Sequence, residues 1–267
     1  MKRTHAICIV LTMASTLVAL DSRASIEYLG SGSGSSVNNL AASATFDIVA
    51  GNFQVTLKNT STSAIAEPKD VLMGLYFSII GITDLTPAAS NAATASGLLV
   101  YSGNTIQNPA ISGAGYLDVS GEWAYVESSS SGTGTFKLGT AGRGVWGAGD
   151  VMNGADRNNS QAPDGADFGI VSSVTTLSSG NNGYQINGPY VKDSVLFNLG
   201  SVPLSFQLSA DVISGVTFVY GTSTSDPSFP GNPPPPPPVG GTIPEPTSVA
   251  VWSLILGLAT FITSRTK

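Results

Sequence analysis

The chain has one cysteine, Cys8, and one histidine, His5, and both lie in a segment that we expect to be removed. A positive start, Lys2-Arg3, precedes an apolar stretch over residues 6–20, and small residues surround the end of this segment at Ala24. The pattern predicts a secretory signal peptide over residues 1–24, which a signal peptidase cleaves after Ala24. The mature chain would then contain neither cysteine nor histidine.

This double absence excludes several classes of site. A disulfide framework, a thiol nucleophile and a thiolate metal site need cysteine, while a Ser-His-Asp relay and imidazole-ligated zinc need histidine. Most common hydrolase mechanisms are therefore excluded. Carboxylate chemistry, hydroxyl chemistry with a lysine base and metal coordination by oxygen alone remain available.

Charge is also scarce. Only 10% of the residues are charged, and 17 acidic residues against 11 basic ones give a formal net charge of −6. Nucleic acids and anionic lipids need clustered basic side chains, so neither is expected as a partner. The composition is compatible with divalent cations, with neutral or cationic glycans, or simply with solubility.

Helical periodicity is absent, whereas β patterns are frequent. Phe53, Val55 and Leu57 alternate with polar residues, as in a strand with one face in a core, and Gly51-Asn52 before them predicts a hairpin turn. The nearly continuous apolar run 71–80 predicts a central strand that is covered on both faces. Further strands are predicted at residues 44–49, 97–101, 123–126, 135–138, 168–174, 191–199 and 206–220. The sequence thus predicts an all-β fold, a β-sandwich or jelly roll, for an ectodomain over residues 25–225.

Regular patterning stops after residue 225. Residues 226–242 are rich in proline and glycine, and residues 233–238 are six consecutive prolines. Polyproline rises about 3.1 Å per residue, so this run would act as a stiff spacer of roughly 19 Å. We expect a linker here; a proline-rich ligand for a recognition module is the alternative.

The last segment, residues 243–267, has three parts: Pro244-Glu245-Pro246, an apolar run over residues 248–263, and a basic end at Arg265 and Lys267. A helix of about 16 residues is about 24 Å long, short of the roughly 30 Å hydrocarbon core. The run therefore predicts a single hydrophobic helix that spans a membrane marginally. The basic end predicts a cytoplasmic C-terminus.

These residues resemble the PEP-CTERM sorting tail of bacterial surface proteins. The resemblance implies that an exosortase, a membrane-embedded cysteine transpeptidase, recognises Pro244, Glu245 and Pro246 and removes the tail. The inner membrane would then hold the protein transiently, before it reaches the outer surface or the exopolysaccharide matrix. An ordinary C-terminal anchor is the alternative. A looser resemblance to exosortase-dependent proteins with a β-rich ectodomain covers residues 45–223, carried in part by Asp70–Phe77 and Gly121–Tyr125.

Oxygen-bearing residues recur at alternate positions of the segment 156–167. An EF-hand places its calcium ligands at such offsets, although Gln161 stands here where the EF-hand has glycine and no helices flank the loop. The pattern allows a calcium site, with Asp150 as a further carboxylate, and a polar surface loop is the alternative. The predicted side-chain ligands are Asp156, Asn158, Ser160, Asp164 and Asp167, with the carbonyl of Ala162 between them.

An aromatic pair, Trp123 and Tyr125, lies between Glu122 and Glu127. Aromatic rings stack on sugar rings, and two carboxylates can act as acid and base on a glycosidic bond. The pair therefore fits a glycan platform and, less well, a hydrolase cleft. Aromatic residues that alternate along a strand are, however, most often the core face of a sandwich.

Five glycines lie between residues 139 and 149, around Arg143 and Trp146. A phosphate-binding loop would end in lysine and serine or threonine and would lead from a strand into a helix, and neither condition is met. A flexible loop or a β-bulge is the better interpretation.

These patterns predict a secreted surface or matrix protein with a structural or adhesive role. Its expected partners are a signal peptidase and an exosortase, with exopolysaccharide as a candidate and no nucleic acid. No catalytic residue and no cofactor apart from the candidate calcium is predicted, so the protein is not expected to be an enzyme. Two alternatives stay open: a calcium-dependent glycan-binding module and a carboxylate-dependent glycoside hydrolase.

Overall fold

The computed structural model describes residues 25–34, 39–95, 99–100, 106–107, 117–157, 162–163, 165–175, 189–233 and 235. The chain divides into two compact units, Met1–Pro234 and Pro235–Lys267. Only residue 235 of the second unit is described, so the fold below is that of the first. The predicted signal peptide and the predicted tail lie outside the described residues.

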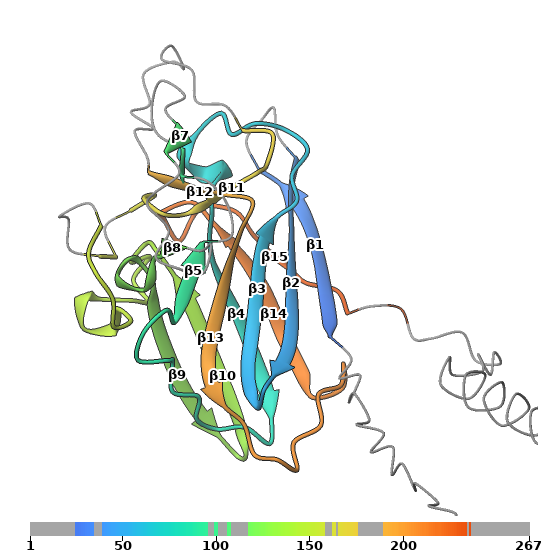
Figure 1. Ribbon diagram of the computed structural model, residues 1–267. Helices are drawn as coiled ribbons and strands as arrows, with labels where there is room; N and C mark the ends of the chain where they lie inside the picture. Colours follow the sequence, from blue (N-terminus) through green and yellow to red (C-terminus); the bar gives the residue numbers. More distant parts are fainter. Residues whose placement is uncertain are drawn as a thin grey trace, which may run out of the picture. The chain divides into compact units, whose positions relative to one another are not determined.

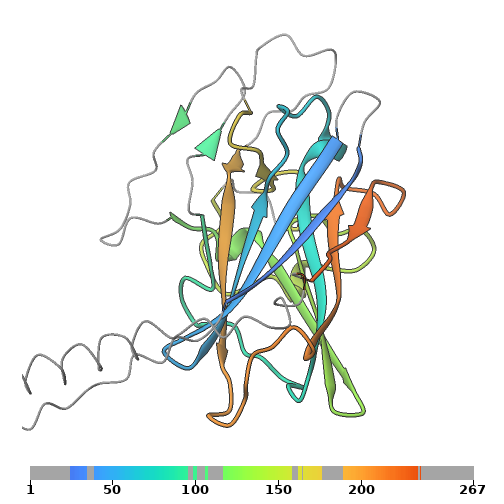
Figure 2. The same cartoon turned by 90° about the vertical axis from the view of Figure 1, so that its right-hand side faces the viewer.

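The described residues are predominantly β, with 49% in strands and 5% in helices. The strands form two sheets (Figures 1 and 2). The prediction of an all-β fold is therefore confirmed. The helical residues of the described part are the short 3₁₀ turns η1 (Pro68–Asp70), η3 (Ser120–Glu122) and η4 (Ala148–Asp150).

One sheet has six strands in the order β1-β2-β3-β13-β5-β8, and all of its pairs are antiparallel. Every second residue of β2 and β3 is buried, as the alternation in the sequence requires. The strands are β1 (Ile26–Ser33), β2 (Asn39–Val49), β3 (Asn52–Asn59), β13 (Ser194–Ser201), β5 (Ala93–Ala95) and β8 (Leu117–Asp118).

The other sheet is built around β4 (Leu72–Ile80), which pairs with β14 on one side and with β10 on the other. The apolar run 71–80 is therefore a central strand, as predicted. It is buried on both faces only over its first half, because Tyr76 and Ser78 are half-buried. Beyond β14 the sheet ends with β15, and beyond β10 it ends with β9. At the start of β4, β11 pairs with Leu72, and β12, β6 and β7 extend the sheet from there in that order. The strands are β9 (Ala124–Ser130), β10 (Thr133–Gly139), β14 (Ile213–Tyr220), β15 (Ser228–Pro230), β11 (Ile170–Val171), β12 (Tyr190–Lys192), β6 (Leu99–Val100) and β7 (Ile106–Gln107).

The two sheets share one hydrophobic core. Phe46 of β2 and Phe53 of β3 contact Phe77 of β4, with ring centroids 5.1 and 6.2 Å apart. All three side chains are buried. Aromatic rings bury the largest apolar areas, so these contacts between strands of different sheets dominate the packing.

Several strand boundaries differ from the prediction. The turn between β2 and β3 is Ala50-Gly51, with φ of 51° and 82° as in a type I′ turn, and not Gly51-Asn52. The predicted strand 191–199 is interrupted at Asp193, whose φ is 82°. Of the predicted strand 206–220, only β14 is a strand. Alternate side chains before it, those of Phe206, Leu208, Ala210 and Val212, are partly buried and pack on the core from an irregular segment that ends in a turn. Their spacing imitates a strand.

The folded unit extends beyond the boundary predicted at residue 225. β15 pairs with β14, and the buried ring of Phe229 lies 5.3 Å from that of Tyr220. Asn232 then exchanges two backbone hydrogen bonds with Leu29 of β1, at 3.1 and 2.7 Å. Phe229 is an apolar anchor in a segment whose proline, glycine and serine otherwise indicate a linker. Asn232, the last paired residue of the described part, thus directly precedes the proline run.

Candidate functional site

The predicted sorting signal, Pro244, Glu245 and Pro246, lies outside the described residues, and so does the apolar run 248–263. In the part of the chain that the structure describes, no helix is long and apolar enough to cross a membrane. The sorting tail stays a prediction from the sequence.

The predicted calcium loop is described only in part. Asp156 is exposed and Asp167 is half-buried, whereas Asn158, Ser160 and Asp164 lie outside the described residues. Next to Asp156, the side chain of Arg157 donates through Nε to the carbonyl of Asp118 at 3.0 Å. Within the described ranges, no group of three or more His, Cys, Asp or Glu residues is arranged to hold a metal ion. Calcium binding by this loop stays a prediction.

Trp123 and Glu122 are buried, with 0% and 1% of their surface exposed. The Trp123 ring meets Phe197 edge-on at a centroid distance of 4.8 Å. It has no exposed face on which a sugar could stack, so it occupies the core position given above as the alternative. Glu122 accepts a hydrogen bond from the backbone N–H of Arg157, and a carboxylate so buried cannot reach a polysaccharide.

Tyr125 is the accessible member of the predicted platform. Its ring lies nearly parallel to that of Phe136, with centroids 6.4 Å apart. Its hydroxyl lies 2.6 Å from the carbonyl of Leu85 and 2.9 Å from Oε2 of Glu127, both acceptors, so its single proton serves one of them at a time. Burial, and then the hydrogen bond to the Glu127 carboxylate, raises the pKa of Tyr125 above its usual value of 10.0. The phenol is therefore held in place and neutral.

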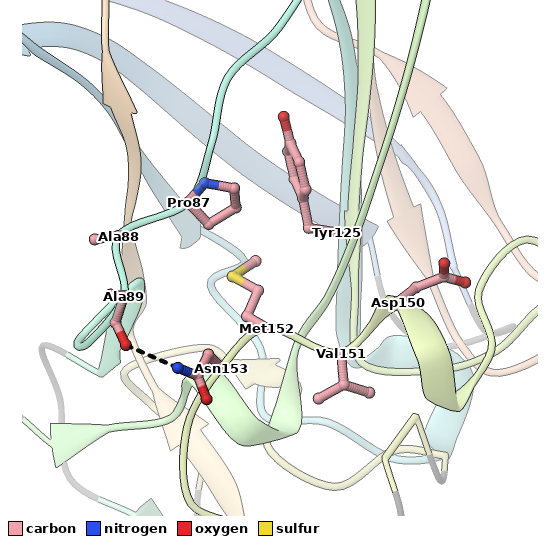
Figure 3. A pocket seen from close by; sticks show the side chains of 8 residues that line it. All are labelled: Pro87, Ala88, Ala89, Tyr125, Asp150, Val151, Met152 and Asn153. Carbon is pink, nitrogen blue, oxygen red and sulfur yellow. Dashed lines mark hydrogen bonds between the residues drawn. The ribbon is translucent and has the colours of Figure 1, made fainter.

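A pocket of about 250 Å³ lies beside Tyr125 (Figure 3). Residues 87–89, between β4 and β5, form one wall, and residues 150–153, which begin at the last residue of η4, form the other. In Figure 3 the side chain of Met152 lies between the two walls, below the Tyr125 ring. The lining residues are Pro87, Ala88, Ala89, Tyr125, Asp150, Val151, Met152 and Asn153.

Backbone and side-chain bonds fix both walls. Met152 N–H donates to the carbonyl of Trp123 at 2.9 Å, which joins the second wall to the start of β9, and Ala88 N–H donates to Asn198 of β13 at 3.1 Å. Asn153 Nδ2 then donates to the carbonyl of Ala89 at 3.2 Å and connects one wall to the other. The pocket is thus formed by the fold itself.

The pocket is small and carries one carboxylate in its lining. Its volume is just below the roughly 300–1,000 Å³ of small-molecule sites, so it has room for one ring-sized group. Among its eight lining residues, Asp150 is the one carboxylate, and its Oδ2 accepts the backbone N–H of Gly147 at 2.7 Å. A glycosidase needs two carboxyl groups across the bond that it cleaves, and these eight residues do not supply them.

The glycine-rich segment holds Trp146 on the outer side of β4 and β10. The buried indole lies 5.6 Å from the ring of Tyr76 and donates through Nε1 to the carbonyl of Lys137 at 3.3 Å. Arg143 donates through Nη1 to the carbonyls of Tyr220 and Gly221. The segment is therefore a packed loop, and its guanidinium binds backbone carbonyls.

Sequence reasoning found Tyr125 but missed the walls of its pocket. Ala89 and Asn153 are 64 residues apart in the chain, and no motif links them. The small, turn-forming run Pro87-Ala88-Ala89 was the available signal, and it carries no chemistry of its own. No family model, no curated protein and no solved structure matches this chain.

Proposed function

We propose that this protein is a secreted cell-surface or exopolysaccharide-matrix protein with a structural or adhesive role, and that its β domain is a β-sandwich. A signal peptide over residues 1–24 would deliver it, and an exosortase would process the tail over residues 243–267. One observation carries the proposal: Asn232 is bonded to β1, and the proline run starts at the next residue. A domain completed immediately before a stiff spacer suits display away from a membrane.

The sandwich is supported by the core that the two sheets share. Phe46 and Phe77 belong to different sheets and pack edge-on at 5.1 Å, and Tyr28 of β1 reaches Ala210 and Ile213 with its hydroxyl, at 3.0 Å each. Such contacts give a domain without disulfides a rigid body, which a structural role outside the cell requires.

Intact-mass analysis of the protein from the cell surface and the medium of its native host tests the sorting proposal. A chain that begins at Ser25 and ends near residues 244–247, with or without an added lipid or glycan, is the expected result. Glu245→Gln should accumulate uncut, whereas Pro236→Ala, a change in the linker, should be processed normally. A mass that extends to Lys267, found only in the inner membrane, would contradict the proposal.

The pocket beside Tyr125 favours a second candidate function, glycan binding. A sugar ring packs its C–H face on apolar and aromatic groups and needs polar partners at its edge. Met152 and Tyr125 supply the first, and the amide of Asn153 supplies the second. This glycan site uses Tyr125 without Trp123. Its proposed contacts to the sugar do not involve calcium.

Filling the pocket tests this function. Ala89 lines the pocket and is exposed, whereas its neighbour Ser90 is exposed and lies outside the lining. In gels that contain the host polysaccharide, the wild-type protein should be retarded, Ala89→Trp should lose the retardation, and Ser90→Trp should keep it. If Ala89→Trp and Ser90→Trp are retarded to the same extent, and both melt at the temperature of the wild type, the pocket has no role in binding.

A further inference from the structure

Within the described part of the chain, β9 forms a sheet edge that lacks the usual protection. An unpaired edge is a template for another strand, and proteins usually shorten such edges or place proline, lysine or a bulge in them. Among the described edges, β7 and β8 have two residues each, and β15 has three and ends at Pro230. β1 has eight residues, and Asn232 is bonded to it at Leu29. β9 has seven residues, Ala124–Ser130, and among the residues that the structure describes a bridge to Val151 occupies its outer side only at Ala124.

The hairpin fixes which backbone groups of β9 point outward. The chain turns from β9 to β10 through Ser131 and Gly132, with φ of 51° and 80° as in a type I′ turn, and Ser130 pairs with Thr133. The pair that flanks a two-residue turn exchanges hydrogen bonds, and bonded and non-bonded pairs then alternate along the ladder. The N–H and C=O groups of Glu127 and Ser129 therefore point away from β10.

Side chains leave this edge open. Residues 127–130 are exposed, and three of the four are serines, which are too small to cover the backbone. The remaining one, Glu127, is turned toward its own domain, because its Oε2 accepts the N–H of Leu85 at 3.1 Å and lies near the Tyr125 hydroxyl. Figure 1 shows β9 at the border of its sheet.

We propose that β9 is a self-association edge, along which the β9 strands of two copies of this chain pair antiparallel about a two-fold axis at Ser128. In this register Glu127 of each copy lies opposite Ser129 of the second copy, and the outward-pointing groups form about four hydrogen bonds. An axis at Glu127 would oppose two like charges. An axis at Ser129 would bring the turn residue Ser131 into the ladder.

A second copy is the occupant that matches what the edge offers. The edge presents backbone donors and acceptors at strand spacing, and another strand satisfies these in a way that an ion or a sugar does not. β9 of a second copy carries complementary backbone donors and acceptors. In the register centred on Ser128, the charged Glu127 of each copy lies opposite Ser129 and not opposite the other Glu127. So few bonds give weak association in dilute solution, but dense display at a surface raises the effective concentration toward the millimolar range.

Cross-linking at the axis tests the register. The chain has no cysteine besides Cys8, which lies in the predicted leader. Directly opposed residues of a non-hydrogen-bonded pair have Cα atoms about 4.5 Å apart, within disulfide range. Ser128→Cys in the full chain, expressed on host cells and mildly oxidised, should give a disulfide-linked dimer. Ser130→Cys is the matched control on the same strand, and it should stay monomeric because it faces Val126 of the second copy.

A second variant tests the hydrogen bonds. Ser129→Pro removes an outward N–H and leaves the ladder to β10 intact. It should lower the dimer yield of Ser128→Cys by about tenfold or more, the effect of losing the paired donors on both copies. Equal cross-linking at residues 128 and 130, no cross-linking at either, or an unchanged yield in a Ser129→Pro protein of normal melting temperature would each overturn the proposal. The effective concentration on cells rests on the proposed surface display, so the same variants are also oxidised as purified full-length protein at about millimolar concentration, where a failure of display leaves the cross-linking unchanged.

Discussion

Gly139→Ala should destabilise the domain through one contact, that with Trp146. Gly139 of β10 and Gly74 of β4 are cross-strand neighbours beneath the indole. A Cβ at residue 139 would lie 2.4 Å from Cη2 of Trp146, and its three nearest atoms would all belong to that ring. The ring also packs on Tyr76 and is hydrogen-bonded to Lys137, so it cannot move aside freely. Overpacking of this kind costs about 1–3 kcal/mol.

The same substitution should become harmless once the ring is removed. In a Trp146→Ala background, alanine at residue 139 meets no indole and is favoured over glycine in a strand by about 0.5–1 kcal/mol. The two changes should therefore be coupled by about 1–3 kcal/mol. Gly74→Ala is the control, because its Cβ would lie 2.4 Å from the carbonyl oxygen of Leu138, a backbone clash that persists without Trp146.

Urea unfolding of the single and double variants, followed by circular dichroism, measures this coupling. In a domain of this size, each kcal/mol corresponds to about 2–4 °C in melting temperature. The reasoning fails if Gly139→Ala costs the same free energy of unfolding with and without Trp146. It also fails if removal of Trp146 rescues Gly74→Ala.

Three further predictions concern the pKa of Tyr125, the packing of Phe229 at the end of the folded domain, and the candidate calcium loop. The fold raises the pKa of Tyr125 and so favours the neutral phenol. The resulting stability is complete below the unfolded pKa of about 10 and is lost as the pH rises above it. Between pH 8 and 11 the melting temperature should therefore fall less for Tyr125→Phe than for the wild-type protein. Phe229→Ala should cost about 3–5 kcal/mol in urea unfolding, because the ring is buried against Tyr220 and Phe218. A cost near zero would show that residues 226–232 belong to the linker and not to the folded domain. If the loop 156–167 binds calcium, millimolar calcium should raise the melting temperature and EDTA should reverse the rise, because a ligand bound only to the native state stabilises that state. An unchanged melting temperature would make this segment a polar surface loop.

Trp123 and Tyr125 illustrate how far local patterns reach. Both alternate along the same predicted strand, yet Trp123 is buried against Phe197 and Tyr125 is half-buried beside a pocket. The difference arises because β9 begins only at Ala124 and because residues 150–152 cross its start. Neither fact is visible in residues 122–127 themselves.

The sequence by itself determined the all-β class, the existence of the hairpin between β2 and β3, and the central strand β4, because period-two alternation and turn residues act between near neighbours in the chain. Tertiary structure alone decided which residues meet across long separations: Gly74 and Gly139 under Trp146, Ala89 and Asn153 across the pocket, and Asn232 on β1. It also decided that β9 lies at a sheet edge, since strand order depends on how the whole core packs. The alternation of residues within a strand predicts which of its side chains are buried. Its neighbouring strands depend on which arrangement of the complete fold has the lowest free energy.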